Sequence, residues 1–324
     1  MSAHPTSLRP RFFKSALANL TNLGTVAAML LAGASVGIAH ADEESKSKSG
    51  GFSLNFNFGF DNRTSYGSNR TKGSGVIKEE SRAVANFSRL VVALPVTVTL
   101  SQGTSESLTI SADDNLLPLM STQVSGDELI IEGDKSRGFS TKKEIKIRLT
   151  VKSLNAINIK GSGDVIGDRL KSDKFDIAIA GSGDVKFKSI NAEQFRIDIK
   201  GSGDVKIDAL EGKSVSADIH GSGDIRLPSV QAGQVNISIK GSGDVTAAGN
   251  ADKVDIEVMG SGDVRSRKLI AREANVKIMA SGDVDVYASE RITASVTGSG
   301  DIRYAGSPMN VNRTVRGSGS IEAM

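Results

Sequence analysis

The chain has 324 residues, of which 40 are Lys or Arg and 37 are Asp or Glu, and it contains neither Cys nor Trp. The lack of Cys excludes a disulfide framework, a thiol nucleophile and a lipidated cysteine. A hydrophobic fraction of 38% is enough for a core that is spread along an elongated domain.

Residues 1–41 have the pattern of an export signal. Three basic residues, Arg9, Arg11 and Lys14, precede an apolar run at 26–38 and an A-x-A cleavage site at 39–41. The run is too short to span a bilayer comfortably, so we expect no transmembrane anchor in the mature chain. Without this segment the chain has 37 basic and 37 acidic side chains, so its net charge is zero. A net charge of zero gives no global attraction to nucleic acid or anionic membranes. We therefore expect a periplasmic, outer-surface or secreted protein without a nucleic-acid partner.

Residues 42–81 form a low-complexity segment that we expect to be a flexible linker. Within it, Phe52, Leu54, Phe56, Phe58 and Phe60 alternate with polar or small residues. One interpretation is a strand or arm that covers an exposed end or edge of the fold. The other is an adhesive segment for a membrane surface, a partner or self-association. The sequence leaves both interpretations open.

Residues 82–160 are rich in strand signals but have no fixed period, which is typical of a cap or first coils that shield the end of a stack. Alternating apolar residues predict strands around 92–100, 108–110, 129–131 and 145–151. The acidic and amide residues at 113–115 before Leu116 predict a short capped helix or helical turn. The segment 124–129 predicts a hairpin turn.

From residue 161 the motif Gly161-Ser162-Gly163-Asp164 returns with minor variation. Its copies begin at 161, 181, 201, 221, 241, 260, 280, 298 and 317. A period of 18 to 20 residues indicates a solenoid. In the copy at 181–200, Phe195, Ile197 and Ile199 alternate with polar residues, as in a strand with one buried face. We therefore predict an all-β fold, with residues 161–324 forming a parallel β-helix (solenoid) with one repeat in each coil.

The two glycines of each copy stay in phase with the buried row. We predict an inward-facing pair at a sharp bend, where another backbone approaches closely. The repeat-structural glycines are Gly161, Gly163, Gly181, Gly183, Gly201, Gly203, Gly221, Gly223, Gly241 and Gly243.

Stacked coils place the motif carboxylates in one ladder. Its members are Asp164, Asp184, Asp204, Asp224, Asp244, Asp263, Asp283 and Asp301. Neighbouring carboxylates about 4.8 Å apart would repel each other by roughly 1 kcal/mol in water-like surroundings. Basic residues two positions further on would offset this repulsion, namely Lys186, Lys206, Arg226, Arg265 and Arg303. The alternative is that the Asp ladder binds Ca²⁺, the one cofactor that the sequence suggests.

Four segments before and within the repeat carry a family resemblance: 84–90, 96–103, 111–116 and the hairpin at 126–132. Followed by the Gly-Ser-Gly-Asp copies, they resemble the head GIN domain family over roughly residues 83–305. That family is labelled as autotransporter adhesins of unknown function. The resemblance implies a right-handed parallel β-helix in an exported bacterial protein, and it supplies no catalytic residues. Nothing after Asp301 resembles a membrane β-barrel, so we do not expect self-transport.

Short, uniform connections and ladders of identical residues favour a non-catalytic module that acts through its long faces. Adhesion, scaffolding of the cell envelope and self-association are the expected roles, with a surface, matrix or envelope ligand. The competing class is a polysaccharide-binding or polysaccharide-degrading β-helix, since glycoside hydrolysis needs two suitably spaced carboxylates. Uniform turns, however, provide no long loop that would desolvate a carboxylate. A third alternative is a rod that calcium stabilises.

A histidine-based site is excluded by count. His220 is the only histidine after the signal, and it falls in the row of Lys160, Lys200 and Lys240. One imidazole cannot supply a multi-histidine metal centre. We therefore predict no catalytic residues.

Overall fold

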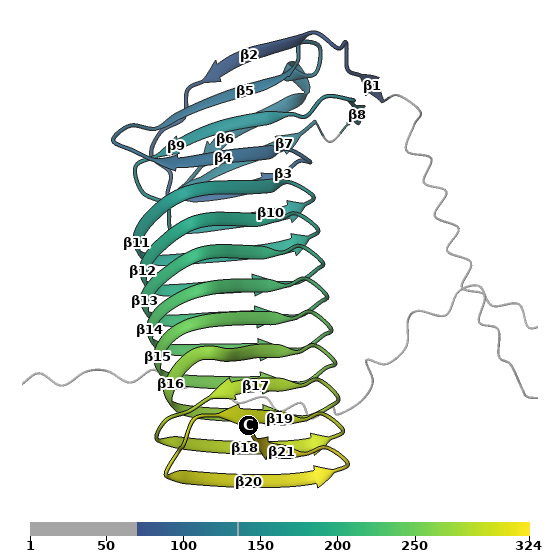
Figure 1. Ribbon diagram of the computed structural model, residues 1–324. Coiled ribbons are helices and arrows are strands. Elements are labelled where there is room, and N and C mark those ends of the chain that lie inside the picture. Colours follow the sequence, from purple (N-terminus) through teal and green to yellow (C-terminus); the bar gives the residue numbers. More distant parts are fainter. Residues whose placement is uncertain (1–69, 135) are drawn as a thin grey trace, which may run out of the picture. The chain divides into compact units, whose positions relative to one another are not determined.

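The computed structural model describes residues 70–134 and 136–324, and these residues form a stack of strands (Figure 1). The expected signal at 1–41 and the Phe-rich segment at 52–60 lie outside the described residues. No helix among the described residues is both long and apolar enough to cross a membrane.

One coil shows why the repeat folds in this way. In β12 (Val185–Ile199), buried and exposed residues alternate, except at residues 188–189 and 193–194, where two outward residues are adjacent. These two phase shifts are corners, and the Gly-Ser-Gly-Asp motif makes the third. Each coil therefore has three extended segments, and side chains from all three meet in the core. We call the sheet formed by the third segments, residues 195–199 in this coil, the third face.

Successive coils pair in parallel at the spacing of the repeat. From β12 to β13 (Val205–Ile219), the register runs from Val185 opposite Val205 to Ile199 opposite Ile219. The predicted parallel β-helix is therefore confirmed. The other regular strands are β11 (Asp164–Gly181), β14 (Ile225–Ile239), β15 (Val245–Val258) and β16 (Val264–Ile278). The last coils contain β17 (Val284–Tyr287), β18 (Arg291–Gly298), β19 (Ile302–Ala305), β20 (Asn310–Gly317) and β21 (Ile321–Ala323).

The shorter repeats lose residues at the corners and in the middle segment. The 19-residue step from 241 to 260 leaves register shifts in the pairing of β15 with both of its neighbours, and Gly249 adopts a φ of 124° there. The 18-residue step interrupts the strand between β17 and β18. The first and third segments keep their register, because they carry the apolar rows of the core.

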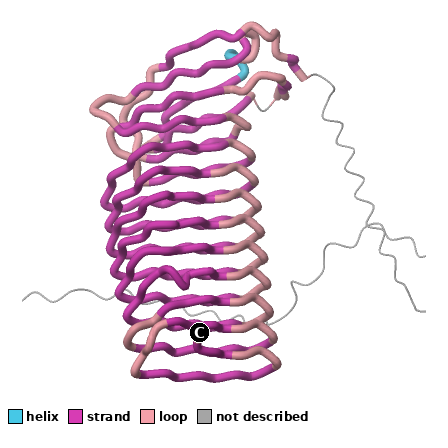
Figure 2. Tube along the Cα trace, viewed as in Figure 1, coloured by secondary structure: helices cyan, strands magenta, loops and turns pink. Residues whose placement is uncertain are grey.

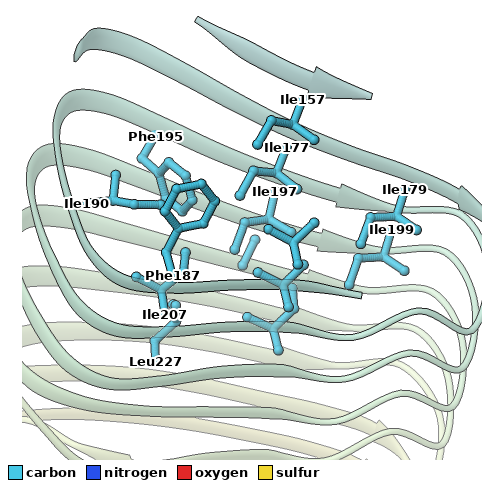
Figure 3. Close-up of a cluster of buried hydrophobic side chains, with 14 of the residues drawn as sticks. Ile157, Ile177, Ile179, Phe187, Ile190, Phe195, Ile197, Ile199, Ile207 and Leu227 are labelled. Carbon is cyan, nitrogen blue, oxygen red and sulfur yellow. The ribbon is translucent and has the colours of Figure 1, made fainter. Parts of the chain in front are cut away.

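The core consists of rows of like side chains that run along the stack. Ile179, Ile199, Ile219 and Ile239 form one such row, and all four are buried. Three aromatic rings meet where two rows adjoin: Phe175 stacks on Phe195 of the next coil and packs edge-on against Phe187. Figure 3 shows Phe187 and Phe195 in this part of the core. Burial of each such side chain stabilises the fold by about 1.5–3 kcal/mol.

The N-terminal strands continue the stack but are threaded out of chain order. Strand β3 (Arg89–Ala93) pairs with β10 (Ala156–Gly161) on one side and with β7 (Glu128–Gly133) on the other. Strand β4 (Thr97–Gln102) likewise lies between β11 and β9 (Lys146–Val151). Two antiparallel strands, β5 (Ser107–Asp113) and β2 (Ile77–Arg82), close this end. Charged side chains on β2 protect the edge from pairing with other chains.

Three expectations for this region can be compared with the structure. The hairpin is confirmed, since β6 (Met120–Ser125) and β7 are antiparallel around Gly126. The helical turn is a single 3-10 turn, η1 (Leu117–Leu119), whose N-cap Leu116 makes no side-chain cap hydrogen bond, so the predicted cap was wrong. Strand β1 (Thr71–Lys72), which pairs with β8 (Phe139–Ser140), lies inside the expected linker 42–81, and β2 begins inside it. Regular structure therefore begins earlier than expected.

Candidate functional site

The Gly-Ser-Gly-Asp corners form a column along one edge of the stack, drawn as loops in Figure 2. A Cβ on Gly203 would lie 2.1 Å from the carbonyl oxygen of Gly183, and one on Gly223 would lie 2.0 Å from that of Gly203. The predicted close approach of another backbone is therefore confirmed. The predicted direction was wrong: the missing side chains would point along the stack at the preceding coil, because the corners are packed backbone on backbone.

The motif carboxylates hold adjacent corners together. In every step of the Asp ladder, Oδ1 accepts a hydrogen bond from the backbone N–H of the next ladder position, at 2.8–3.0 Å. The last acceptor is Asp301, which receives the N–H of Ser320. Ser320 has no carboxylate, so the ladder ends in that coil.

The second carboxylate oxygen is directed at the basic ladder. Oδ2 of Asp184 lies 3.0 Å from Lys186 Nζ, and Arg265 bridges Asp244 at 2.8 Å and Asp263 at 3.0 Å. Arg226 bridges Asp204 and Asp224 in the same way. Arg303 contacts Asp283 at 3.8 Å and Asp285 at 2.8 Å, whereas Lys206 pairs with Asp208 outside the ladder. The predicted basic ladder is therefore present at four of its five members.

Calcium would have to compete with these contacts. Among residues 70–134 and 136–324, no group of three or more His, Cys, Asp or Glu side chains is arranged to hold a metal ion. Most ladder carboxylates use one oxygen for a backbone N–H and the other for a cationic side chain. The calcium ladder stays a prediction.

The ladder predicts a pH dependence of stability. Desolvation raises the pKa values of Asp184 and Asp244, but the N–H of the next coil and the basic side chain outweigh it, so both pKa values lie below the ordinary 3.8. A depressed carboxylate stabilises the fold above its unfolded pKa and loses that contribution as pH falls through its folded pKa. We expect the urea midpoint to be flat from about pH 7 to pH 5 and to fall below about pH 4.

The matched comparison is Asp184→Asn/Asp244→Asn. The asparagines keep an acceptor for the N–H but do not titrate in this range, so the decline below about pH 4 should be shallower than in the wild type. Equal declines in both proteins would contradict the assignment.

The third face carries a second continuous row of polar side chains, separate from the Asp ladder. This row runs through seven coils: Asp176, Arg196, Ser216, Asn236, Asp255, Asn275 and Thr293. Although they point outward from the sheet, Asn236, Asp255 and Asn275 are only partly exposed. The alternation in the sequence predicts that these positions lie on the outer face. It does not identify them as a candidate binding site, because alternation does not indicate how far neighbouring residues shield a side chain from solvent.

Two shallow grooves lie along this row. One, of about 470 Å³, is lined by Asn236, Asp255, Asn275 and Thr293 among others. The other, of about 590 Å³, is lined by Asp176, Arg196 and Ser216 and by the neighbouring corner residues. Because Ser216 pairs with Asn236, the two grooves adjoin along a single row. Together they offer amide, hydroxyl and charged groups at the spacing of the coils.

Hydrogen bonds fix the side chains of the first groove. Asn275 Nδ2 donates to Asp255 Oδ1 at 2.7 Å, and Gln234 Nε2 donates to Asp255 Oδ2 at 3.0 Å. Lys253 Nζ also lies 2.8 Å from Asp255 Oδ2. Desolvation raises the pKa of Asp255, but Lys253 and Asn275 together hold it below its ordinary value. The groove therefore presents a fixed carboxylate rather than a proton donor.

His220 directly follows the third segment of its coil and lies at the edge of the third face, near Asp198. Its Nδ1 is 3.7 Å from Asp198 Oδ1, which is beyond hydrogen-bond distance, and its side chain is 37% exposed. Lys200 pairs with the other oxygen of Asp198 at 3.1 Å. Within residues 70–134 and 136–324, no hydroxyl or thiol group forms a hydrogen bond with His220 that would complete a nucleophilic triad with Asp198.

None of the described carboxyl groups whose pKa departs from its ordinary value has the signature of a glycosidase acid. Such an acid has a raised pKa, usually because it is desolvated. Among the residues that the structure describes, every carboxyl with a resolved pKa shift is shifted downward. The arrangement is suited to binding through fixed polar groups.

A comparison with protein families agrees with this architecture. The family model described as "Putative auto-transporter adhesin, head GIN domain" matches residues 86–209 and 196–308. The chain belongs to this family. The predicted resemblance is thereby confirmed, and the two matched ranges show that the head GIN domain covers both the N-terminal strands and most of the repeat. A search of curated proteins gave no match.

Solved structures share the head GIN fold. A putative lipid binding protein from Parabacteroides distasonis is 26% identical, with a TM-score of 0.59 over 79% of this chain and 99% of that one. A putative adhesin from Parabacteroides merdae is 21% identical, with a TM-score of 0.65 over 79% of this chain and 100% of that one. A putative adhesin from Parabacteroides distasonis is 22% identical, with a TM-score of 0.64 over the same shares. The latter two likenesses concern the fold alone.

Proposed function

We propose that this head GIN protein is a non-catalytic, adhesin-like binding module of the cell envelope or cell surface, and that its third face binds a linear polar polymer such as a glycan. The observation that carries the proposal is the row of fixed polar side chains from Asp176 to Thr293, with two adjoining grooves beside it. A repeated array favours repeated weak contacts along one extended ligand.

The chemistry of the grooves supports binding rather than turnover. Amide and hydroxyl groups such as those of Asn236, Asn275 and Thr293 can exchange hydrogen bonds with sugar hydroxyls. The lowered pKa of Asp255 is unsuited to a general acid. The relative that is 26% identical is named as a lipid binding protein, which is also a binding role. The family description supports a location in the envelope or outside the cell.

The test is binding of the labelled full chain to an array of bacterial and host polysaccharides. Replacing both Asn236 and Asn275 by Ala removes two groove amides, each worth about 0.5–1.5 kcal/mol in a hydrogen bond, so affinity for the bound glycan should fall about tenfold or more. The matched control is Asn191→Ala/Gln231→Ala, which removes two exposed amides from the second segments and should leave affinity unchanged.

Three results would count against the proposal. Equal affinity of the Asn236/Asn275 variant and the wild type would remove the third face as the site. Release of reducing sugars during incubation would show catalysis and overturn the non-catalytic assignment. Protection of the chain from added protease, both in intact cells and after the outer membrane is permeabilised, would exclude an envelope or surface location.

A further inference from the structure

A cluster of unpaired cations lies at the N-terminal end of the stack, away from the third-face grooves. Strands β1 and β8 pair at Thr71–Phe139 and Lys72–Ser140, which brings two basic segments of the chain side by side. The cluster consists of the exposed residues Arg70, Lys72, Arg137, Lys142 and Lys143. We call it the basic corner.

The basic corner differs from the coils in how its charge is balanced. Along the coils, cations such as Lys186, Arg226 and Arg265 have carboxylate partners within 3.0 Å. In the corner, the nearby acids are occupied by other groups. Asp113 is buried and accepts the Gly75 N–H at 2.6 Å and the Thr141 hydroxyl at 2.5 Å.

The remaining acids of these loops are also engaged. Asp114 accepts from the Ser74 hydroxyl, Asp134 accepts from Ser136, and Glu144 pairs with Lys146 at 3.2 Å. Neutral donors leave the charges of Asp113, Asp114 and Asp134 in place, so the five cations of the corner exceed these three carboxylates by two charges, although the chain as a whole is nearly balanced.

The corner also has a concave part. A pocket of about 530 Å³ is lined by the cations Lys72, Lys142 and Lys143 and by one carboxylate, that of Asp113. Its other lining residues are Gly73, Ser74, Gly75, Ser140 and Thr141. The hydroxyl protons of Ser74 and Thr141 are already donated to Asp114 and Asp113, so the donors that face the hollow are the three ammonium groups. Three ammonium groups against one carboxylate suit the oxygens of a phosphate group.

We propose that the basic corner docks this end of the protein onto anionic phospholipid headgroups. The charge is complementary to such a surface, since each Lys or Arg near an anionic leaflet contributes about 1 kcal/mol to membrane attraction. The sequence supplies a second reason for choosing lipid over a soluble polyanion. The segment 52–60 ends ten residues before Arg70 and contains four Phe and one Leu in alternation with polar or small residues. Aromatic residues next to basic ones are the composition of segments that bind a membrane interface.

The experiment is flotation of the full chain with vesicles of phosphatidylcholine alone or with added phosphatidylglycerol, at low and high salt. We expect binding that requires phosphatidylglycerol and weakens with salt. Replacing Lys72, Lys142 and Lys143 together by Gln should weaken it by about a hundredfold. The matched control replaces Lys160, Lys240 and Lys268 by Gln, removes the same charge from exposed coil positions and should bind like the wild type.

The outcomes separate the proposal from its alternatives. Unchanged melting temperature of the corner variant would show that its loss of binding is not a loss of folding. Binding that does not depend on phosphatidylglycerol, or equal losses in the corner and control variants, would overturn the proposal. Capture by a soluble anionic polysaccharide without vesicle binding would overturn the assignment to lipid, and so would full competition by inorganic phosphate. Glycan binding at Asn236 and Asn275 is independent of all these results.

Discussion

Replacing Gly223 by Ala is expected to destabilise the stack by at least about 3 kcal/mol, a large effect for one methyl group. The added Cβ would lie 2.0 Å from the carbonyl oxygen of Gly203 and 3.0 Å from its carbonyl carbon. Those atoms are backbone, so no side-chain rotation can relieve the overlap. The coils would have to separate locally, and the nearby Ser222 N–H bond to the Gly201 carbonyl, now 2.9 Å, would lengthen.

The neighbouring residue provides the control. Ser222 is exposed in the same corner, and Ser222→Ala should change the free energy of unfolding by no more than about 0.5 kcal/mol. Both variants are compared with the wild type by urea unfolding, and by hydrogen exchange of the adjacent coils, because a solenoid can open locally. A Gly223→Ala variant as stable as Ser222→Ala would show that the corners are not packed backbone on backbone.

The coil could be predicted from the sequence because several independent features of the repeat indicate the same fold. Alternation in 195–199, a second apolar pair at Ile190 and Ala192, and a fixed period leave a parallel β-helix as the solution. The corner glycines were assigned the wrong direction, because parity within a strand separates inside from outside but cannot describe a direction along the stack. That direction became visible only when the preceding coil was in place.

The N-terminal threading was beyond the reach of sequence patterns. Strands β4, β5 and β9 have a recognisable apolar alternation. Nothing local to β3 and β4, however, indicates that they lie between β10–β11 and β7–β9. Such pairings depend on long-range register, which is set when apolar faces of distant segments are buried together.

The candidate sites were predictable to different degrees. The ion pairs of the Asp ladder followed from stacking like residues, whereas the bonds from Oδ1 to the next N–H depend on corner geometry. The third-face row was outward by parity, but its partial burial comes from neighbours one coil away. The basic corner joins residues 72 and 142, which only the pairing of β1 with β8 brings together.

The second large effect is expected at Phe187, where a glycine makes room for an aromatic ring. Phe187, labelled in Figure 3, is 2% exposed, and its ring packs edge-on against Phe175 with centroids 6.0 Å apart. A Cβ on Gly167 would lie 2.0 Å from Phe187 Cε1, so the ring occupies the space of the missing side chain in the coil above. Phe187→Ala should therefore cost about 3–5 kcal/mol, because it leaves a cavity spanning two coils.

A double-mutant cycle tests this interpretation directly. Gly167→Val alone should destabilise the fold, since the ring must move, at a cost of about 1–3 kcal/mol. In the Phe187→Ala background the valine instead fills part of the cavity, so the two changes together should cost about 1–3 kcal/mol less than their sum. The control cycle combines Gly167→Val with Leu227→Ala. Leu227 lies in the same inward row, two coils beyond Phe187, so the free-energy changes of these two substitutions should add within about 0.5 kcal/mol. Additivity in both cycles would mean that the glycine and the ring do not share one space, and the aromatic cluster would then be a local packing solution independent of the repeat.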